Sequence, residues 1–302
     1  MQNKINGATA VYGLIGNPVE HSFSPLIHNT LAAGTGENLL YAAFPVKDAQ
    51  HVEAALRGAA ALGIRGMNVT APYKSAVIPF LLDVEPGARA IGAVNTLVSV
   101  RDESGAIRGY KGYNTDYLGL QRALEEMGIA LSSMNVILIG AGGAARAAGY
   151  MCGASGVRRL AILNRTREKA EALAEELQKE FPSMEICARD LSDAVREASC
   201  PGKVLAIQCT SVGLGSADAV PIKDPAFYDK ISAAYECIYH PEETGFLKLV
   251  HAAGKPGRNG LDMLLWQGIL AFQLWTGRLP GKELADEVRG KLYALIQERS
   301  VG

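Results

Sequence analysis

Short apolar runs alternate along this chain with longer segments whose apolar residues recur at helical spacing. The runs predict strands at residues 11–15, 40–44, 66–69, 136–139, 160–163 and 204–208. Segments such as 48–62 and 167–180 carry one apolar face each and predict helices between the strands. Because strands and helices alternate over nearly the whole length, the pattern predicts an α/β protein with mainly parallel sheets.

Two segments of the N-terminal half need separate predictions. Residues 94–100 and 107–113 flank a turn-forming sequence, Asp102-Glu103-Ser104-Gly105, and this arrangement predicts a hairpin. Residues 73–82 are expected to be helical, although Pro79 limits the length of that helix.

A glycine-rich turn directly follows the apolar run at residues 136–139. Gly140 permits a tight turn, Gly142 lets the backbone approach a pyrophosphate, and Ala145 is small enough for a helix to pack on the strand. The pyrophosphate would bind free N–H groups at the helix N-terminus, where the helix dipole also favours an anion. The order of strand, glycine-rich turn, helix and strand therefore predicts a dinucleotide-binding, Rossmann-like unit.

The end of the second strand of this unit indicates which cofactor it prefers. Asn164, Arg165 and Thr166 follow the strand, and Arg167 and Lys169 come next. A site that prefers NAD usually places Asp or Glu here, to bond the ribose 2′-hydroxyl. Cations instead match a 2′-phosphate. The sequence therefore predicts NADP over NAD.

Composition excludes several classes of protein. With 302 residues the chain is long enough for two domains, and 48% hydrophobic and 20% charged residues are typical of a soluble globular protein. A net charge of −1 argues against a nucleic-acid surface, and no apolar stretch is long enough to span a membrane. Five cysteines without a C-x-x-C motif indicate reduced thiols and a cytoplasmic location. The histidines and cysteines are not grouped, which predicts no metal, and His21 and His28 are expected on helix surfaces.

Polar clusters follow several predicted strands of the N-terminal half. Their hydroxyl, amide, ammonium and carboxylate groups suit a small, polyhydroxylated, anionic substrate. Hydride transfer from an alcohol needs a group that takes the hydroxyl proton, and Lys74 is the candidate, with Asp116 to position it. From the residues alone each has an ordinary alternative, Lys74 as a solvated residue at a helix start and Asp116 as a helix cap.

These clusters give the chain a resemblance to the shikimate and quinate dehydrogenase family along its full length. The matching motifs lie at residues 16–25, 68–74, 92–96, 114–116, 140–144, 164–166, 210–213 and 260–267. The resemblance implies an N-terminal α/β substrate-binding domain, residues 1–115 plus 262–302, and a Rossmann-like NADP-binding domain, residues 116–261, with a cleft between them.

The resemblance also implies an activity and its residues. The activity is the reversible NADP-linked reduction of 3-dehydroshikimate to shikimate, in aromatic amino-acid biosynthesis. Lys74 and Asp116 would form the catalytic pair. The substrate would be bound by Ser22, Ser24, Asn68, Thr70, Asn95, Tyr239 and Gln267. The cofactor would be held by Gly140, Ala141, Gly142, Gly143, Ala144, Asn164, Arg165, Thr166, Lys169, Thr210, Cys237 and Gly260.

The sequence departs from the family pattern near the predicted cofactor site. Gln208-Cys209 stands where Asn-Ala is usual, and Glu236 stands where many members have Asp. Residues 265–267 and 274–277 look closer to the branch that also accepts quinate. The alternatives are therefore a dehydrogenase that uses both acids with NAD or NADP, a relative acting on an amino-substituted analogue, and a dinucleotide-binding sensor without catalysis. A homodimer is also left open.

Overall fold

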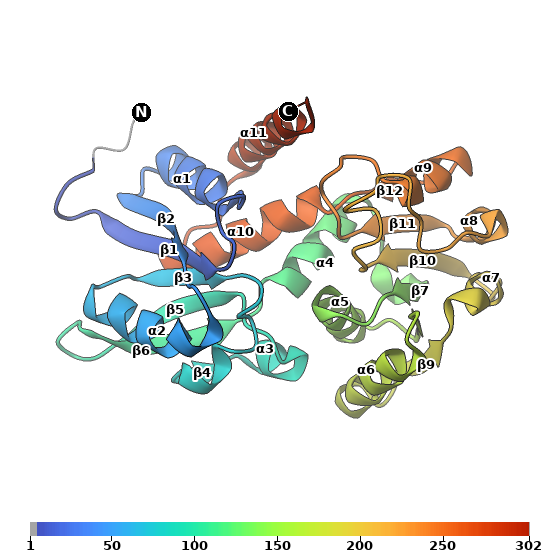
Figure 1. Cartoon of the computed structure of the whole chain (residues 1–302), viewed down its shortest axis with the longest axis horizontal. Helices are drawn as coiled ribbons and strands as arrows, with labels where there is room; N and C mark the ends of the chain where they lie inside the picture. The colour runs from blue at the N-terminus through green and yellow to red at the C-terminus, as the bar shows by residue number, and fades with distance from the viewer. Residues whose placement is uncertain (1–4, 302) are drawn as a thin grey trace. The chain divides into compact units, whose positions relative to one another are not determined.

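Two six-stranded sheets form the framework of the structure, a computed structural model that describes residues 5–301, with side chains up to residue 298. The chain divides into two units (Figure 1). The first unit runs to Gly119 and includes Leu265–Ala294, whereas the second comprises Leu120–Leu264 and the residues from Leu295 onward. Each sheet lies within one unit, so the two-part α/β fold class is confirmed.

The sheet of the first unit is mixed. Its strands, in the spatial order β2-β1-β3-β5-β6-β4, are β1 (Ala10–Gly16), β2 (Leu39–Pro45), β3 (Gly66–Val69), β4 (Asp83–Val84), β5 (Thr96–Arg101) and β6 (Ile107–Tyr113). Strands β2 and β3 pair with β1 in parallel, whereas β5 runs antiparallel to both β3 and β6. The predicted hairpin is thus confirmed, and Val98 lies opposite Lys111 in it.

Helices cover both faces of this sheet. They are α1 (Ser24–Thr35), α2 (Val52–Ala61), α3 (Pro86–Ile91), most of α10 (Leu261–Thr276) and most of α11 (Lys282–Val301), with 3-10 turns at Ala49–His51 and Ile78–Phe80. The helix predicted over residues 73–82 is wrong, because only turns and the second 3-10 segment form there. Pro79 explains this, since it lacks an N–H donor and its ring collides with the carbonyl group four residues earlier in a helix.

Helix α10 packs against the first sheet and helix α1. The Trp275 indole donates a hydrogen bond to the Leu97 carbonyl oxygen at 2.9 Å, and its ring lies 5.0 Å from that of Tyr12. Gly268 leaves room for Ile27 of α1, and Gly34 of α1 leaves room for Leu284 of α11. These contacts join segments from both ends of the chain into one core.

The second sheet is entirely parallel. Its strands, in the order β12-β11-β10-β7-β8-β9, are β7 (Met134–Ile139), β8 (Arg159–Leu163), β9 (Glu185–Arg189), β10 (Lys203–Gln208), β11 (Ala233–Glu236) and β12 (Gly257–Arg258). Counted from β7, this is the 3-2-1-4-5-6 order of a dinucleotide-binding fold. The order reverses between β7 and β10, and ligands of such sheets bind at the carboxyl ends of the strands beside that point.

Helices lie on both faces of the second sheet (Figure 1). Helices α5 (Gly143–Ala154) and α6 (Arg167–Glu180) lie on one face, and Gly149 of α5 lets Leu177 of α6 approach. The other face shares an apolar core with α7 (Ala194–Ala198), α8 (Pro225–Lys230) and α9 (Gly245–Ala252). Helix α4 (Asp116–Glu126) and 3-10 turns at Leu131–Ser133 and Leu191–Asp193 complete the elements. Within the described residues no helix is long and apolar enough to cross a membrane.

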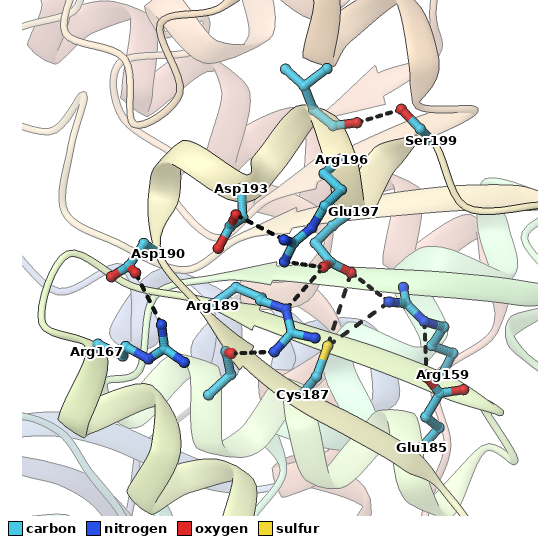
Figure 2. A network of polar contacts seen from close by, with 12 residues as sticks. Arg159, Arg167, Glu185, Cys187, Arg189, Asp190, Asp193, Arg196, Glu197 and Ser199 are labelled. Carbon is cyan, nitrogen blue, oxygen red and sulfur yellow. Dashed lines mark hydrogen bonds and ion pairs between the residues drawn. The ribbon is translucent and has the colours of Figure 1, made fainter.

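A buried glutamate joins α7 to the outer strands of this sheet. Figure 2 shows the side chains of Arg159, Arg189 and Arg196 converging on Glu197, which is only 3% exposed. Arg189 Nε lies 3.1 Å from Glu197 Oε1, and Arg159 bonds the other carboxylate oxygen. Burial favours the neutral acid, but these arginine hydrogen bonds outweigh it and lower the pKa of Glu197. The cluster therefore acts as a structural clamp, because protein groups satisfy the buried charge.

Candidate functional site

Lys74 and Asp116, the predicted catalytic residues, are in direct contact. Lys74 Nζ lies 2.7 Å from Asp116 Oδ2, and Asn95 Nδ2 donates to the other oxygen, Asp116 Oδ1, at 2.8 Å. The Lys74 side chain is 36% exposed, whereas that of Asp116 is 17% exposed. The carboxylate is thus held on both sides while the ammonium group remains accessible to solvent.

Strand order explains why these three residues meet. Lys74 follows β3, Asn95 precedes β5, and Asp116 follows β6. Because β5 is antiparallel to both of its neighbours, the end of β3, the start of β5 and the end of β6 lie at the same edge of the sheet. The first unit therefore brings together polar residues that lie far apart in the sequence.

Asn114 and Asn95 fix the loop that carries Asp116. Asn114 Oδ1 accepts from the Asp116 backbone N–H at 3.0 Å, and its amide donates to the Ala93 carbonyl oxygen at 2.9 Å. Asn95 Oδ1 accepts from the Thr115 backbone N–H at 2.7 Å. The backbone start of α4 is thereby fastened to the loop before β5.

Asn68 is buried, 4% exposed, and its side chain makes four hydrogen bonds within the protein. Its Oδ1 accepts from the Tyr41 hydroxyl at 2.8 Å and faces His28 Nε2 at 3.0 Å. Its amide donates to the Asn95 carbonyl oxygen and the Thr96 hydroxyl, both at 3.1 Å. These bonds fill the capacity of the carboxamide, so a direct bond to a substrate would require one of them to be shared.

The sequence did not indicate that His28 is buried. The expectation of a helix-surface position is wrong, because the imidazole is fully buried and stacks on the Tyr41 ring at 4.3 Å between centroids. Burial lowers the pKa of His28 to about 3, so the ring is neutral at physiological pH. The residues around His28 in the sequence gave no signal of burial, because its partners, Tyr41 on β2 and Asn68 on β3, are distant in the chain.

The remaining predicted substrate ligands of the first unit lie at the start of α1, after β3 and on α10. Ser22 and Ser24 are joined by a hydroxyl–hydroxyl bond of 3.2 Å. Thr70 lies beside Gly16, where any side chain would collide with it, and its N–H donates to the Ile15 carbonyl oxygen at 2.9 Å. Gln267 is buried on α10.

The glycine-rich turn of the second unit has the geometry that a pyrophosphate site requires. Gly140 has a φ of +116°, and a Cβ there would lie 3.1 Å from Thr210 Cγ2. Gly142 caps α5 without a side-chain hydrogen bond, and a Cβ on Gly142 or Gly143 would meet no atom within 4 Å. Ala141 and Ala144 complete the turn. The N-terminus of α5 therefore has no side-chain cap and no crowding at Gly142 and Gly143, and this fits a dinucleotide phosphate.

The cations after β8 are not equivalent. Arg167 is engaged, with Nε 2.9 Å from Glu171 Oε1 and a second pair to Asp190 at 3.3 Å. Arg165 and Lys169 are exposed and form no ion pair with any residue that the structure describes. Asn164 donates to the Thr166 carbonyl oxygen at 2.8 Å and shapes the loop. Arg165 and Lys169 are thus the cations that a 2′-phosphate can reach.

The two departures from the family pattern contact each other. Gln208, at the end of β10, donates to Glu236 Oε1 at 3.1 Å and to the Val212 carbonyl oxygen at 3.0 Å, and it accepts from the Thr210 N–H. The Thr244 hydroxyl donates to Glu236 Oε2 at 2.7 Å. Burial raises the pKa of Glu236 to about 7, although both hydrogen bonds oppose the shift. This buried pair fixes the loop that contains Thr210.

Cys237, Gly260 and Tyr239 follow at the same edge of the second sheet. Gly260 packs directly on the Cys237 carbonyl group, where a side chain would not fit, and its N–H donates to the Ile238 carbonyl oxygen at 2.8 Å. Cys209 Sγ lies 3.5 Å from Cys237 Sγ. Tyr239 is half-buried and belongs to the second unit. Among the described residues no group of three potential metal ligands occurs.

A doubly wound sheet with a glycine-rich turn and exposed cations after β8, together with a lysine–aspartate pair, is typical of a dinucleotide-dependent oxidoreductase. The chain belongs to the shikimate/quinate dehydrogenase family. The shikimate dehydrogenase substrate binding domain matches residues 14–97, the shikimate/quinate 5-dehydrogenase family matches residues 121–199, and the shikimate 5′-dehydrogenase C-terminal domain matches residues 260–287.

Known relatives agree with this assignment. The chain is 40% identical over 285 residues to the shikimate dehydrogenase (NADP(+)) of Moorella thermoacetica, and the match covers 94% of both chains. A shikimate 5-dehydrogenase of Thermus thermophilus, solved with NADP(H) and shikimate, superposes with a TM-score of 0.81 at 33% identity, covering 94% of this chain and 99% of that one. The Listeria monocytogenes enzyme, solved with shikimate and NAD, gives 0.87 at 29% identity, covering 97% and 99%.

Proposed function

We propose that this protein is an NADP-dependent shikimate dehydrogenase, which reversibly reduces 3-dehydroshikimate to shikimate in aromatic amino-acid biosynthesis. The observation that carries the proposal is the contact of Lys74 Nζ with Asp116 Oδ2 at 2.7 Å, with Asn95 on the second carboxylate oxygen. The names of the relatives, which combine shikimate with a nicotinamide dinucleotide, support the substrate and the cofactor.

The substrate is bound by hydroxyl and amide groups of the first unit. The adjoining hydroxyls of Ser22 and Ser24 donate to its carboxylate. Thr70 and Gln267 bond its ring hydroxyls, and Asn68 and Asn95 contribute by sharing bonds that they make within the protein. Tyr239, from the second unit, is the further substrate contact in this proposal.

Proton transfer is the task of Lys74. When bound, NADPH supplies a hydride to the carbonyl carbon of the substrate. The Lys74 ammonium group donates a proton to the carbonyl oxygen as that oxygen becomes a hydroxyl. Asp116 holds the Lys74 side chain in place, and Asn95 holds Asp116. Because Lys74 is partly exposed, solvent can return the proton after each turnover. In the oxidative direction the neutral amine takes the same proton back.

The cofactor is held by three parts of the second unit. The turn from Gly140 to Ala144 presents backbone N–H groups to the pyrophosphate. Arg165 and Lys169 bind the 2′-phosphate, and Asn164 and Thr166 shape that loop. Thr210, Cys237 and Gly260 line the carboxyl ends of β10 and β11, where we place the nicotinamide half.

A second candidate is a dehydrogenase that uses both shikimate and quinate, with NAD or NADP. The Listeria monocytogenes structure with shikimate and NAD favours it for the cofactor. The quinate-like sequence at residues 274–277 gives less support, because Trp275 packs in the core and donates to the Leu97 carbonyl oxygen. The homodimer and the cytoplasmic location remain predictions from the sequence.

The test is an absorbance assay at the reduced-nicotinamide band, with shikimate and quinate each combined with NADP and NAD. Turnover mainly with shikimate and NADP supports the proposal. Comparable turnover with quinate or NAD favours the second candidate. No turnover in any combination, from protein that still binds NADP, would favour a sensor without catalysis or an altered substrate.

A further inference from the structure

We propose that Cys209 and Cys237 form a redox modification site, which small-molecule disulfides such as oxidised glutathione convert reversibly to an intramolecular disulfide. The two sulfur atoms lie 3.5 Å apart. The inference goes beyond the proposed dehydrogenase activity, because the thiol chemistry takes place whether or not the protein turns over a substrate.

Strand register holds the two cysteines together. Gln208 and Glu236 are paired in the parallel ladder of β10 and β11, and each cysteine is the next residue along its strand. The Cys237 N–H donates to the Gln208 carbonyl oxygen at 2.9 Å, so the ladder continues to this point. Adjacent strands lie about 4.8 Å apart, and a disulfide spans Cα separations of roughly 4.4–6.8 Å. The backbone therefore needs little change to accept the bond.

The environments of the cysteines favour this pair. Cys209 and Cys237 are both half-buried, and neither is enclosed in the core as Cys152 is. Cys152 is fully buried in α5, and burial raises the pKa of its thiol to about 12, which makes it unreactive. The bond to Cys237 and then burial raise the pKa of Cys209.

The reaction is an ordinary thiol–disulfide exchange in two steps. The thiolate of one cysteine of the pair attacks one sulfur of oxidised glutathione, forms a mixed disulfide and expels one glutathione thiolate. The other cysteine then loses its proton and attacks the protein sulfur of the mixed disulfide, which expels the second glutathione thiolate. The two protein thiols are oxidised to one disulfide, and the glutathione disulfide is reduced to two thiols that take up the two protons.

The bond would change the shape of the cofactor site. A disulfide bond is about 2.05 Å long, so the two side chains must rearrange to bring the sulfur atoms together from the present 3.5 Å. The Cys209 carbonyl carbon lies 3.2 Å from the Cβ position of Gly140, and Gly260 packs directly on the Cys237 backbone. The rearranged side chains therefore adjoin the dinucleotide turn and Gly260, and the oxidised protein should bind NADP more weakly.

The experiment treats the reduced full-length protein with oxidised glutathione, alkylates the remaining thiols and maps the peptides by mass spectrometry. NADP affinity is measured by titration on the same samples. We expect a cross-link between Cys209 and Cys237, with a loss of NADP affinity on the order of tenfold, since displacements near 1 Å in a binding site can cost still more. Dithiothreitol should reverse both changes.

Two variants make the test specific, and each is compared with its own reduced state. Cys209→Ala cannot form the intramolecular bond, so its oxidation should stop at a mixed disulfide of Cys237 with glutathione, which peptide mapping shows as an added glutathione mass. Cys200→Ser retains the pair and should respond as the parent protein does. A cross-link through Cys152, a link between two chains, an affinity that does not change on cross-linking, or no glutathione adduct on Cys237 in Cys209→Ala would overturn the inference. Because peptide mapping requires no turnover, a failure of the proposed dehydrogenase activity would be seen separately.

Discussion

At the scale of single residues, the Asp116 carboxylate holds Lys74, and Asn95 in turn holds that carboxylate. Lys74→Ala removes the proton donor, so we expect kcat to fall by about 10²–10⁴-fold. NADP affinity should change little, because the proposed cofactor residues belong to the second unit. Steady-state kinetics with a parallel NADP titration measures both quantities.

Lys111 provides the matched control for this variant. It lies on β6 in the same unit and pairs with Asp83 at 2.7 Å, away from Asp116. Lys111→Ala should retain kcat. If Lys74→Ala kept its turnover as well, the proposed role of the lysine would be wrong.

Arg165 and Arg167 allow a second comparison between single residues. Arg165 has no ionic partner among the described residues, whereas Arg167 is paired with Glu171 and Asp190. Arg165→Ala should weaken NADP binding by about 10–100-fold, which corresponds to roughly 1.5–3 kcal/mol for charged hydrogen bonds, and should leave NAD binding nearly unchanged. Arg167→Ala should have the smaller effect on NADP. Titration with both cofactors is the measurement, and equal losses for NADP and NAD would refute the 2′-phosphate assignment.

At the scale of helices and strands, the Glu197 carboxylate on α7 bonds Arg159 of β8 and Arg189 of β9 (Figure 2). Glu197→Gln removes the negative charge that the three arginines share, and because Arg159 and Arg196 keep pairs with Glu185 and Asp193, the loss should be about 1.5–3 kcal/mol, the range for hydrogen bonds to charged groups. Urea unfolding measures the loss. Glu185→Gln is the control, because Glu185 is 69% exposed and a surface pair with Arg159 contributes less than about 1 kcal/mol.

The pH dependence of this clamp follows from its lowered pKa. The stabilisation is fully present above the ordinary pKa of 4.5 and is lost as the pH falls through the lower value of the folded state. The parent protein should therefore lose stability in acid more steeply than Glu197→Gln. Equal slopes for the two proteins would contradict the assignment of the charged form to Glu197.

Glu236 is also buried, but its pKa is raised and not lowered, so its effect on stability changes with pH in the opposite direction. Its folded-state pKa is raised from 4.5 to about 7, so its contribution is favourable below pH 4.5 and is lost as the pH rises toward and through 7. Since one pKa unit corresponds to about 1.36 kcal/mol, Glu236→Gln should be more stable than the parent at pH 8 by up to roughly 3 kcal/mol. The measurement is the free energy of unfolding of both proteins between about pH 5 and 8, where the Glu236 contribution changes. Glu242→Gln, at an exposed position, should leave the slope unchanged.

At the scale of the whole molecule, Trp275 joins a C-terminal helix to strands from the N-terminal part of the chain. It lies 178 residues from its hydrogen-bond partner Leu97, and its ring packs against Tyr12 and His28. Trp275→Ala should destabilise the first unit by about 3–5 kcal/mol. NADP binding should persist, because these contacts belong to the first unit.

Thermal unfolding with a parallel NADP titration tests this prediction. Leu274→Ala is the matched control, since the neighbouring side chain on α10 is 38% exposed and should cost little. A similar loss of stability in both variants would show that α10 is held by general packing and not by the indole.

Local signals in the sequence account for many elements. The helix predicted at residues 167–180 is α6, and the strand predicted at 107–113 is β6, because their periodicity is written in adjacent residues. Helices α3 and α8 were not predicted, although each begins with a proline after an acidic cap. Glu85 accepts from the Gly87 and Ala88 N–H groups, and Asp224 accepts from the Ala226 N–H. Those helices are only six residues long, too short to show a period.

The sequence by itself determined the α/β class, the glycine-rich turn and the cations that follow β8, because each depends on residues adjacent in the chain. Only the tertiary structure decided that Asn68 bonds Tyr41 and His28, that Arg167 is paired while Arg165 has no ionic partner among the described residues, and that Gln208 contacts Glu236. Periodicity specifies which face of a strand a side chain occupies. Strand order and register specify its neighbours, and these depend on how distant segments pack together.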